Sequence, residues 1–489
     1  MPALVWVVLA ASPDLHGQQS DGQQSGGLAT ASDGQGKKNV LVLLADDLGW
    51  GDIGLHGSEA TTTNIDQLAR DGVELTRFYA FPACSPARAA MLTGRFPHRY
   101  GISGPVRSRE VGLPIEERLL PSVFQSAGYH TSLIGKWHLG SLDEKSHPIE
   151  RGFDHFYGFM GASIDYFDHA VSSTSKRRRK RPDWQRNGEQ IKEEGYSTDL
   201  LVDEAIRMIK DRKESKPFCI VLSFNAPHSP FQAPKAIVAK YDKRLSGQSA
   251  IYAAMLESLD IGIGRILKVI DQQQLRDDTI VVFASDNGAS RVGNNDPFRG
   301  AKREVYEGGI HVPCVIRAPG IKPGTKSDQL TGIHDLFPTL ATGANISLGE
   351  SKRPLDGLDL WSNFADGKQD SRGLVIAEEA HAFFQDNWKL IKAADGAAEL
   401  YDLAADPLET KDLSKSETAI FDQMSALLDE YKKSVADDLP IPDSFKKKSA
   451  LEKAPLSDAT KQHSRHQSSL VSHFDLKTGR SPTPRGRRN

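Results

Sequence analysis

A cysteine and an arginine stand one helical turn apart near residue 84, and together they could bind and attack an anion. Pro86 suits the first position of a helix, and Ser85 suits its N-cap. Cys84 is then expected just outside the N-terminus of a helix that continues through residues 89–92, where backbone N–H groups favour an anion and Arg88 lies close. For an isolated cysteine, the plainer interpretation is a buried thiol beside a helix cap.

Two pairs of oxygen-bearing side chains each follow an apolar run. They are Asp46 and Asp47, after residues 39–45, and Asp286 and Asn287, after residues 279–285. Strand ends in an α/β sheet converge on the functional crevice, so these groups could meet there. Crowded carboxylates repel, and an all-oxygen set favours calcium or magnesium over zinc. Taken singly, each pair also fits a strand-end turn or a helix cap.

Lysines and histidines occur at three further turns. They are Lys136 and His138 within the Gly-rich segment 135–140, His228 after residues 217–225, and Lys302 in the turn-rich segment 300–309. Lys136 and His138 are two residues apart and would point to the same side of an extended chain. Taken alone, each of these four is more often a solvated charge or a hydrogen-bonded core histidine.

The elements that must position these residues alternate along the chain from residue 38. Expected strands cover 39–45, 129–134, 217–225 and 279–285, and expected helices cover 63–72 and 198–212. Apolar residues recur every three or four positions from Ile251 to Ile270 and mark a long amphipathic helix. This alternation predicts a largely parallel sheet covered by helices on both faces.

The pattern changes after about residue 354. Short antiparallel strands are expected at 374–379, 387–393 and 399–403, with a helix over 416–434 packed against them. We therefore divide the chain into a signal-peptide-like segment with a linker (1–37), a main domain (38–353), a C-terminal subdomain (354–444) and a basic, disordered tail (445–489).

Composition restricts the partners and the compartment. The formal net charge of -3 over 489 residues does not favour nucleic-acid or membrane binding by the whole surface. Three cysteines are too few for a disulfide framework, and Cys219 and Cys314 lie in runs expected to be buried strands. The apolar residues 4–11 and the Gln/Gly/Ser-rich stretch to residue 36 are typical of a signal peptide and linker, although no Lys or Arg precedes them, so we expect export to the periplasm or the medium. No later segment is long and apolar enough to span a bilayer.

The segment Cys84-Ser85-Pro86-Ala87-Arg88 resembles the Cys-x-Pro-x-Arg maturation signature of type I sulfatases, in the alkaline-phosphatase superfamily. The resemblance runs from about Asn39 to Leu413, and within the family the chain looks most similar to the arylsulfatase B (N-acetylgalactosamine-4-sulfatase) branch. Further segments that carry it are residues 93–95, 135–140, 151–154, 165–169, 293–295 and 298–302.

This resemblance implies a fold, a metal and a modified nucleophile. The fold would be α/β, with a large mixed, mostly parallel sheet between helices. The metal would be calcium, held by Asp46, Asp47, Asp286 and Asn287. A maturation enzyme would oxidise Cys84 to formylglycine, whose hydrate attacks sulfur. The remaining implied roles are Arg88 and Lys136 orienting residue 84, His138 as the base there, and His228 with Lys302 at the sulfate and leaving group.

The implied activity is hydrolysis of sulfate esters on sulfated carbohydrates, with aryl sulfates as artificial substrates. One alternative is a phosphonate or phosphate ester hydrolase of the same superfamily, because some relatives share the cysteine signature. Another is a non-catalytic glycan-binding relative, which the complete polar set disfavours. The basic run from Lys176 to Arg181 could line the mouth of a site for a sulfated polymer, or be a solvated loop.

Overall fold

The computed structural model describes residues 36–107, 110–171 and 181–437. The signal-peptide-like segment before Gly36, the expected tail and residues 176–180 of the basic run lie outside the described residues. The described residues belong to one compact unit, so the boundary expected at residue 354 stays a prediction. None of the helices in the described ranges has the length and apolar character that crossing a bilayer requires.

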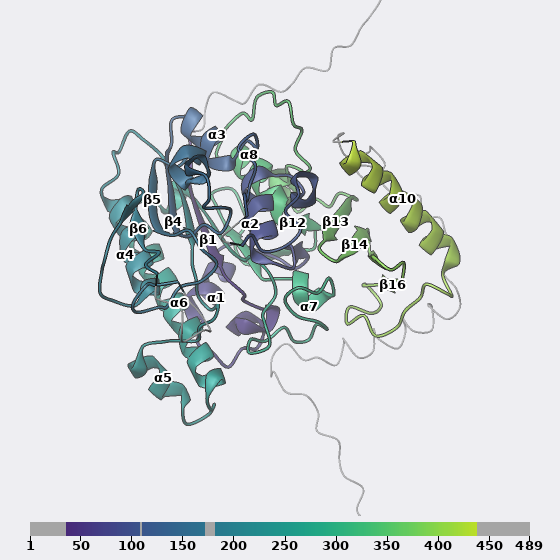
Figure 1. The fold of residues 1–489 in the computed structure, drawn as a ribbon, viewed down its shortest axis with the longest axis horizontal. Helices are drawn as coiled ribbons and strands as arrows, with labels where there is room; N and C mark the ends of the chain where they lie inside the picture. The colour runs from purple at the N-terminus through teal and green to yellow at the C-terminus, as the bar shows by residue number, and fades with distance from the viewer. Residues whose placement is uncertain (1–35, 108–109, 172–180, 438–489) are drawn as a thin grey trace, which may run out of the picture. The chain divides into compact units, whose positions relative to one another are not determined.

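Within the described residues, ten strands form one mixed, mostly parallel sheet, as predicted (Figure 1). In spatial order they are β11 (Thr325–Ser327), β2 (Val73–Leu75), β10 (Cys314–Arg317), β9 (Thr279–Ser285), β1 (Asn39–Ala45), β8 (Phe218–Ser223), β4 (His130–Lys136), β5 (His155–Phe159), β6 (Gln185–Arg186) and β7 (Glu189–Gln190). The five strands from β9 to β5 run parallel, with Val42 of β1 beside Val221 and Val282. Their carboxyl ends therefore share one edge of the sheet.

The described chain also contains ten α-helices and seven 3-10 turns. The α-helices are α1 (Thr63–Arg70), α2 (Cys84–Thr93), α3 (Leu120–Ser126), α4 (Ser197–Lys210), α5 (Lys235–Tyr241), α6 (Gln248–Gln272), α7 (Glu307–Ile310), α8 (Leu336–Gly343), α9 (Trp361–Asp366) and α10 (Thr418–Ala436). The 3-10 turns are η1 (Trp50–Asp52), η2 (Gly54–His56), η3 (Pro97–Tyr100), η4 (Glu144–Ser146), η5 (Pro148–Arg151), η6 (Arg276–Asp278) and η7 (Ile333–Asp335).

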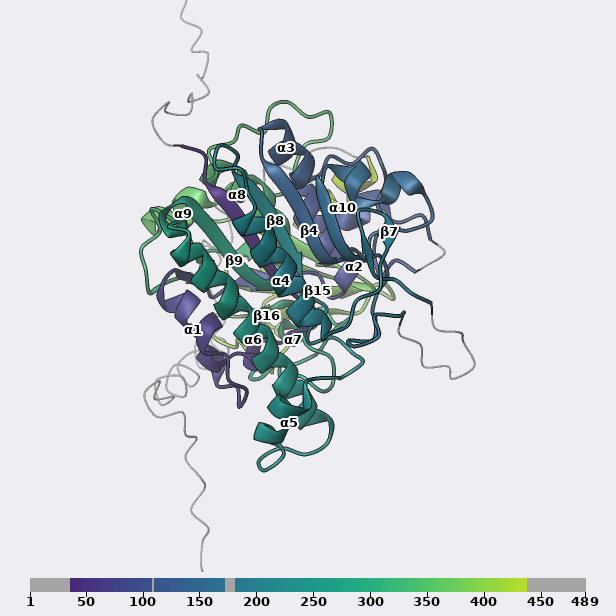
Figure 2. The same ribbon diagram turned by 90° about the vertical axis from the view of Figure 1, so that its left-hand side faces the viewer.

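Two apolar layers lie on the two faces of the sheet. Alternate residues of β1 point to opposite faces, because side chains alternate along a strand. Leu41 and Leu43 pack with α1, α4 and α6, and Figure 2 shows α4 and α6 crossing in front of β8 and β9. Val40 and Val42 pack in the layer that contains α2, α8 and the C-terminal sheet.

The C-terminal sheet has one more strand in the described chain than the sequence predicted. Its strands are β13 (Gly373–Ala377), β14 (Ala380–Gln385), β15 (Trp388–Ala393) and β16 (Ala398–Asp402), all antiparallel in chain order. The added strand is β14, and α10 packs on β14 and β15 as expected. A small parallel pair, β12 (Thr331–Gly332) with β3 (Phe78–Tyr79), completes the described sheets.

A buried ion triad joins the C-terminal sheet to α7. Lys389 of β15 is completely buried, and its Nζ lies 2.8 Å from Glu307 Oε1 and 2.7 Å from Glu409 Oε1. Glu307 opens α7, a few residues after Lys302. The C-terminal sheet therefore supports the segment that carries Lys302.

Replacing Lys389 with methionine is expected to lower the free energy of unfolding by about 3 to 5 kcal/mol, because two buried carboxylates would lose their shared cation. Urea unfolding measures the change. Lys392→Met is the matched control on the same strand, since its Nζ lies 3.6 Å from the exposed carboxylate of Asp429 and such pairs contribute about 0 to 1 kcal/mol. Equal destabilisation by the two substitutions would contradict the triad's role.

Candidate active site

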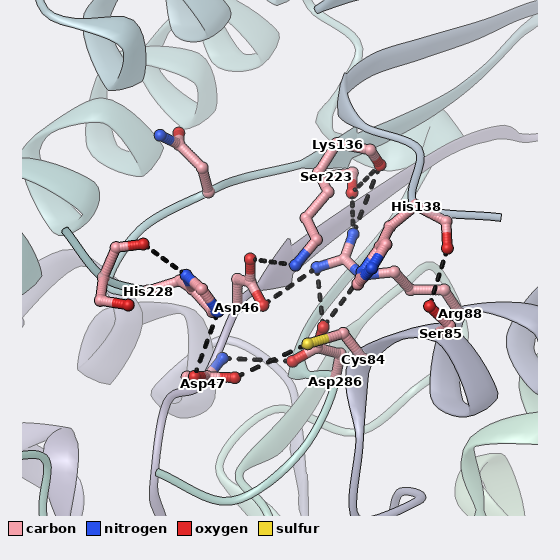
Figure 3. A network of polar contacts seen from close by, with 12 residues as sticks. Asp46, Asp47, Cys84, Ser85, Arg88, Lys136, His138, Ser223, His228 and Asp286 are labelled. Carbon is pink, nitrogen blue, oxygen red and sulfur yellow. Dashed lines mark hydrogen bonds and ion pairs between the residues drawn. The ribbon is translucent and has the colours of Figure 1, made fainter. Parts of the chain in front are cut away.

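The carboxyl ends of β1, β4, β8 and β9 bring the predicted polar groups together (Figure 3). Asp46 and Asp47 leave β1, Asp286 and Asn287 leave β9, and Lys136 ends β4. All five are buried. Gly135, with φ of +108°, allows this convergence, because a Cβ there would stand 1.9 Å from the carbonyl oxygen of Ser223 on β8.

Cys84 is the first residue of α2, and not a residue just before it as predicted. Ala83 is the N-cap, with extended backbone. Ser85 is not the cap, because its hydroxyl donates to the His138 carbonyl at 2.8 Å and accepts from the Val106 N–H at 2.9 Å. The serine thereby fastens two loops to the start of α2.

Three carboxylates of the site each pair with a cation. Asp46 Oδ2 lies 2.7 Å from Lys136 Nζ, Asp286 Oδ2 lies 2.7 Å from an Arg88 terminal nitrogen, and Asp47 Oδ1 lies 2.5 Å from Lys302 Nζ. Burial alone would raise the pKa of Asp46, but the charges of Lys136, His228, Arg88 and Lys302 bring it well below its ordinary value. Burial raises the pKa of Asp286, and repulsion from Asp46 and Asp47 adds to this despite Arg88.

The Cys84 sulfur lies among these charges. Lys302 Nζ is 3.2 Å from it, and Asp47 Oδ1 is 3.9 Å away. Burial raises the pKa of the thiol to about 12, although Lys136 and Lys302 oppose the change. An unmodified thiol is therefore protonated at neutral pH and a poor nucleophile.

Two buried oxygens at the strand ends have no hydrogen-bond partner within the described chain: Asp46 Oδ1 and Asn287 Oδ1. Leaving such atoms unsatisfied is costly, and a hard cation would satisfy both. Ligand atoms of Asp46, Asp47, Cys84 and His228 lie within 4.8 Å of one another, so a metal could also be held with the sulfur and imidazole nearby. The residues present thus fit a divalent cation.

The two histidines reach the site differently. His138 has a left-handed backbone, with φ of +56°, so it does not continue an extended chain from Lys136 as predicted. Its Nε2 lies 3.1 Å from the Val106 carbonyl and donates to it, which leaves the buried Nδ1 with a lone pair and no partner among the described residues. Burial, then Lys136 and Arg88, lower its pKa well below the usual range.

His228 stands on the other side of Asp47 from Lys302. Its Nε2 lies 3.7 Å from Asp47 Oδ2, and its Nδ1 donates to the Ser229 carbonyl at 2.6 Å. Burial lowers its pKa, although Asp46 and Asp47 oppose the change. For Lys302, burial by itself would lower the pKa, but the negative charges around the lysine raise it. Lys302 therefore carries a proton at neutral pH.

Sequence reasoning missed Ser223 and Tyr252. The Ser223 hydroxyl receives a hydrogen bond from Arg88 and donates to the Lys136 carbonyl at 2.7 Å (Figure 3). The Tyr252 hydroxyl lies 3.2 Å from the Asp47 carbonyl oxygen. Ser223 is the last residue of β8, and a polar residue at the end of a predicted strand could have been recognised in the sequence as a site candidate. Tyr252 lies inside α6, where no sequence pattern distinguishes it.

A cleft of ≈ 1160 Å³ opens above His138. Residues 101–107 and 110–112 form part of its lining, and residues 160–163 and 181–183 form another part. Arg303 and the turn Glu378-Glu379, from the C-terminal sheet, complete it. Arg181, the one described residue of the basic run, also lines this cleft.

The Sulfatase family profile matches residues 38–346, which carry this fold and the strand-end site, and the chain belongs to that family. Among named relatives, human N-acetylgalactosamine-6-sulfatase is 33% identical over 356 residues, covering 68% of this chain and 66% of that protein. Arylsulfatase J of Mus musculus is 31% identical over 351 residues, covering 69% of this chain and 58% of that protein. The matches therefore span less than two thirds of the length of these two relatives.

Solved structures match more of the chain. The crystal structure of Ps i-CgsB has a TM-score of 0.75 and 28% identity, covering 90% of this chain and 99% of that one. The same protein in complex with k-i-k-neocarrahexaose has a TM-score of 0.76 and 29% identity, covering 90% and 100%. These relatives support the family and do not single out the arylsulfatase B branch.

Proposed function

We propose that the protein hydrolyses sulfate esters of sulfated carbohydrates, and aryl sulfates as artificial substrates. The observation that carries this proposal is the buried Cys84 with the cations Arg88, Lys136 and Lys302 around it. The open cleft reaches this region at His138, whose carbonyl accepts a hydrogen bond from Ser85, the residue after Cys84. Such a site suits a compact anion attached to a larger alcohol. The name of N-acetylgalactosamine-6-sulfatase and the k-i-k-neocarrahexaose in the Ps i-CgsB complex support a carbohydrate substrate.

We further propose a metal and a modified residue for this site. Asp46, Asp47, Asp286 and Asn287 would hold calcium, since Asp46 Oδ1 and Asn287 Oδ1 are hard ligands that accept no hydrogen bond within the described chain. Bound calcium would offset the negative charge of the sulfate. Formylglycine at position 84, made by a maturation enzyme, would supply a hydroxyl nucleophile once hydrated.

The cations of the chain would bind and stabilise the transferring sulfate. Arg88 and Lys136 are buried, and their partners Asp286 and Asp46 hold them in place, so they need little reorganisation when charge develops. Their role beside residue 84 is therefore to fix the orientation of the sulfate oxygens. Removing Arg88 would leave the buried Asp286 without its cation, and removing Lys136 would leave Asp46 with only an Arg88 nitrogen, 3.6 Å away.

Two proton transfers are assigned to different sides of residue 84. His138 is neutral at neutral pH and would accept a proton at Nδ1, because Nε2 donates to Val106. Lys302 holds its proton there and would donate to the leaving oxygen. His228, neutral and close to Asp47, would hold the sulfate or leaving group by a hydrogen bond.

Three expectations from the sequence remain proposals. We propose export, from residues 4–11, and a place in the arylsulfatase B branch, from the sequence resemblance. Of the basic run, Arg181 lines the cleft and is proposed to contact a sulfated polymer there, the alternative being a solvated loop. The partners proposed are the sulfated saccharide and the maturation enzyme.

The activity is tested with sulfate, phosphonate and phosphate monoesters that share one aryl leaving group. We expect the sulfate ester to have the highest kcat/KM by at least about 100-fold, because the chain belongs to the Sulfatase family. A preference for the phosphonate or phosphate ester would favour the superfamily alternative. Binding of sulfated oligosaccharides with no turnover of any ester by modified protein would favour the non-catalytic alternative.

A further inference from the structure

The turn between β13 and β14 places two carboxylates in the wall of the cleft. Glu378 and Glu379 line the same cavity as His138, although they come from the C-terminal sheet. The Glu378 N–H donates to the Ala380 carbonyl at 3.0 Å, which closes a tight turn. The position of Glu378 is therefore set by a strand pair and not by a long loop.

Glu378 lies close to the segment that holds His138. Its Oε1 is 3.8 Å from the point where a Cβ on Gly104 would stand, and Gly104 is two residues from Val106, whose carbonyl oxygen accepts the His138 hydrogen bond. Neither carboxylate oxygen has a hydrogen-bond partner within the described chain, and Oε2 is buried whereas Oε1 is not. Oε1, at the wall of the cleft, is therefore the oxygen that a substrate donor can reach.

The charges around this carboxyl are of both signs. Burial raises the pKa of Glu378 to about 7; Arg303 and Lys302 oppose the rise, and Glu379 adds to it. Although the two cations act on it, neither makes an ion pair with Glu378 in the described residues. Glu378 thus gains its full negative charge only above neutral pH.

We propose that Glu378 is a specificity-determining residue, which accepts a hydrogen bond from a free hydroxyl of the sulfated sugar and disfavours a second anionic group at that place. The preferred substrate unit then carries one sulfate, with a neutral hydroxyl facing the β13–β14 turn. This inference rests on the proposed function. Its physical basis is that a hydroxyl can donate to Oε1, whereas a second sulfate would meet a like charge.

The test measures binding to the Cys84→Ala variant loaded with calcium, so that substrates stay intact. The probes are two forms of one sulfated disaccharide, one with a single sulfate and one with a second sulfate on the neighbouring hydroxyl. Calorimetry gives the ratio of their Kd values. We expect the disulfated form to bind about tenfold more weakly at pH 8, as for a like-charge contact across a few ångströms of partly screened cleft.

Adding Glu378→Gln is expected to bring this ratio close to one, since the amide keeps a hydrogen-bonding oxygen without the charge. The matched control is Glu110→Gln, which removes the same charge from another part of the cleft lining and should keep the ratio. The ratio should also fall as the pH drops from 8 to 6 with Glu378 present, because the carboxyl is neutralised while a sulfate stays ionised. With Glu378→Gln the ratio should not depend on pH.

Equal Kd values for the two probes with Glu378 present, or an unchanged ratio after Glu378→Gln, would overturn the proposal, as would failure of either probe to bind. The activity of modified protein is assayed separately with the same two sugars. Discrimination in binding combined with no hydrolysis would leave the assignment of Glu378 standing and refute the proposed function. Hydrolysis of both sugars at equal kcat/KM, together with equal Kd values, would refute the assignment of Glu378 and leave the proposed function standing.

Discussion

Replacing Cys84 with alanine is expected to lower kcat for sulfate ester hydrolysis by at least about 10⁴-fold, because the substitution removes the proposed covalent nucleophile. The fold should survive, since only one small buried group at the start of α2 is lost. Mass spectrometry of the peptide across position 84 in active enzyme should find the aldehyde. Turnover and far-UV circular dichroism of the purified variant measure the two effects.

Cys219→Ala is the matched control for this prediction. Cys219 is a fully buried thiol within β8, and its neighbours are apolar. Cys219→Ala should lower the free energy of unfolding somewhat, and the kcat of enzyme modified at residue 84 should stay unchanged. Full sulfatase activity in a sample whose Cys84 is entirely a thiol would rule out the modified nucleophile.

Removing Asp286 is expected to have the second largest effect. Asp286→Ala should lower activity by about 10³-fold or more, because it removes one proposed metal ligand and leaves Arg88 without its 2.7 Å partner. The metal content, measured by elemental mass spectrometry, should fall from one calcium per chain. Calcium should also raise the Tm of metal-free protein, but much less for the variant.

Asp278→Ala is the control, because this exposed carboxylate at the other end of β9 pairs with Lys38 at 2.7 Å and lies far from the functional edge. An unchanged calcium stoichiometry in folded, metal-saturated Asp286→Ala protein would sink the ligand assignment. Zinc as the native ion would contradict calcium and would make Cys84 or His228 the ligands to test.

The strands of the main sheet could be predicted because each is a continuous apolar run bounded by polar residues. The run 39–45 coincides with β1 and 279–285 with β9. Once these strands are parallel, the residues that follow them must share an edge, so Asp46 and Asp286 could be expected to meet. In the C-terminal sheet β14 was missed, since the buried run 382–385 follows its partner strand closely and resembles a connection.

By itself, the sequence determined the types of element, the parallel sheet and which polar residues end its strands, because apolar spacing and strand direction are local properties. Only the tertiary structure decided which partner each group has. Ser85 holds two loops instead of capping α2, His138 donates to the Val106 carbonyl, and Glu378 reaches the cleft from the C-terminal sheet. These contacts join residues tens to hundreds of positions apart, and they depend on how loops close over the sheet, which no local pattern encodes.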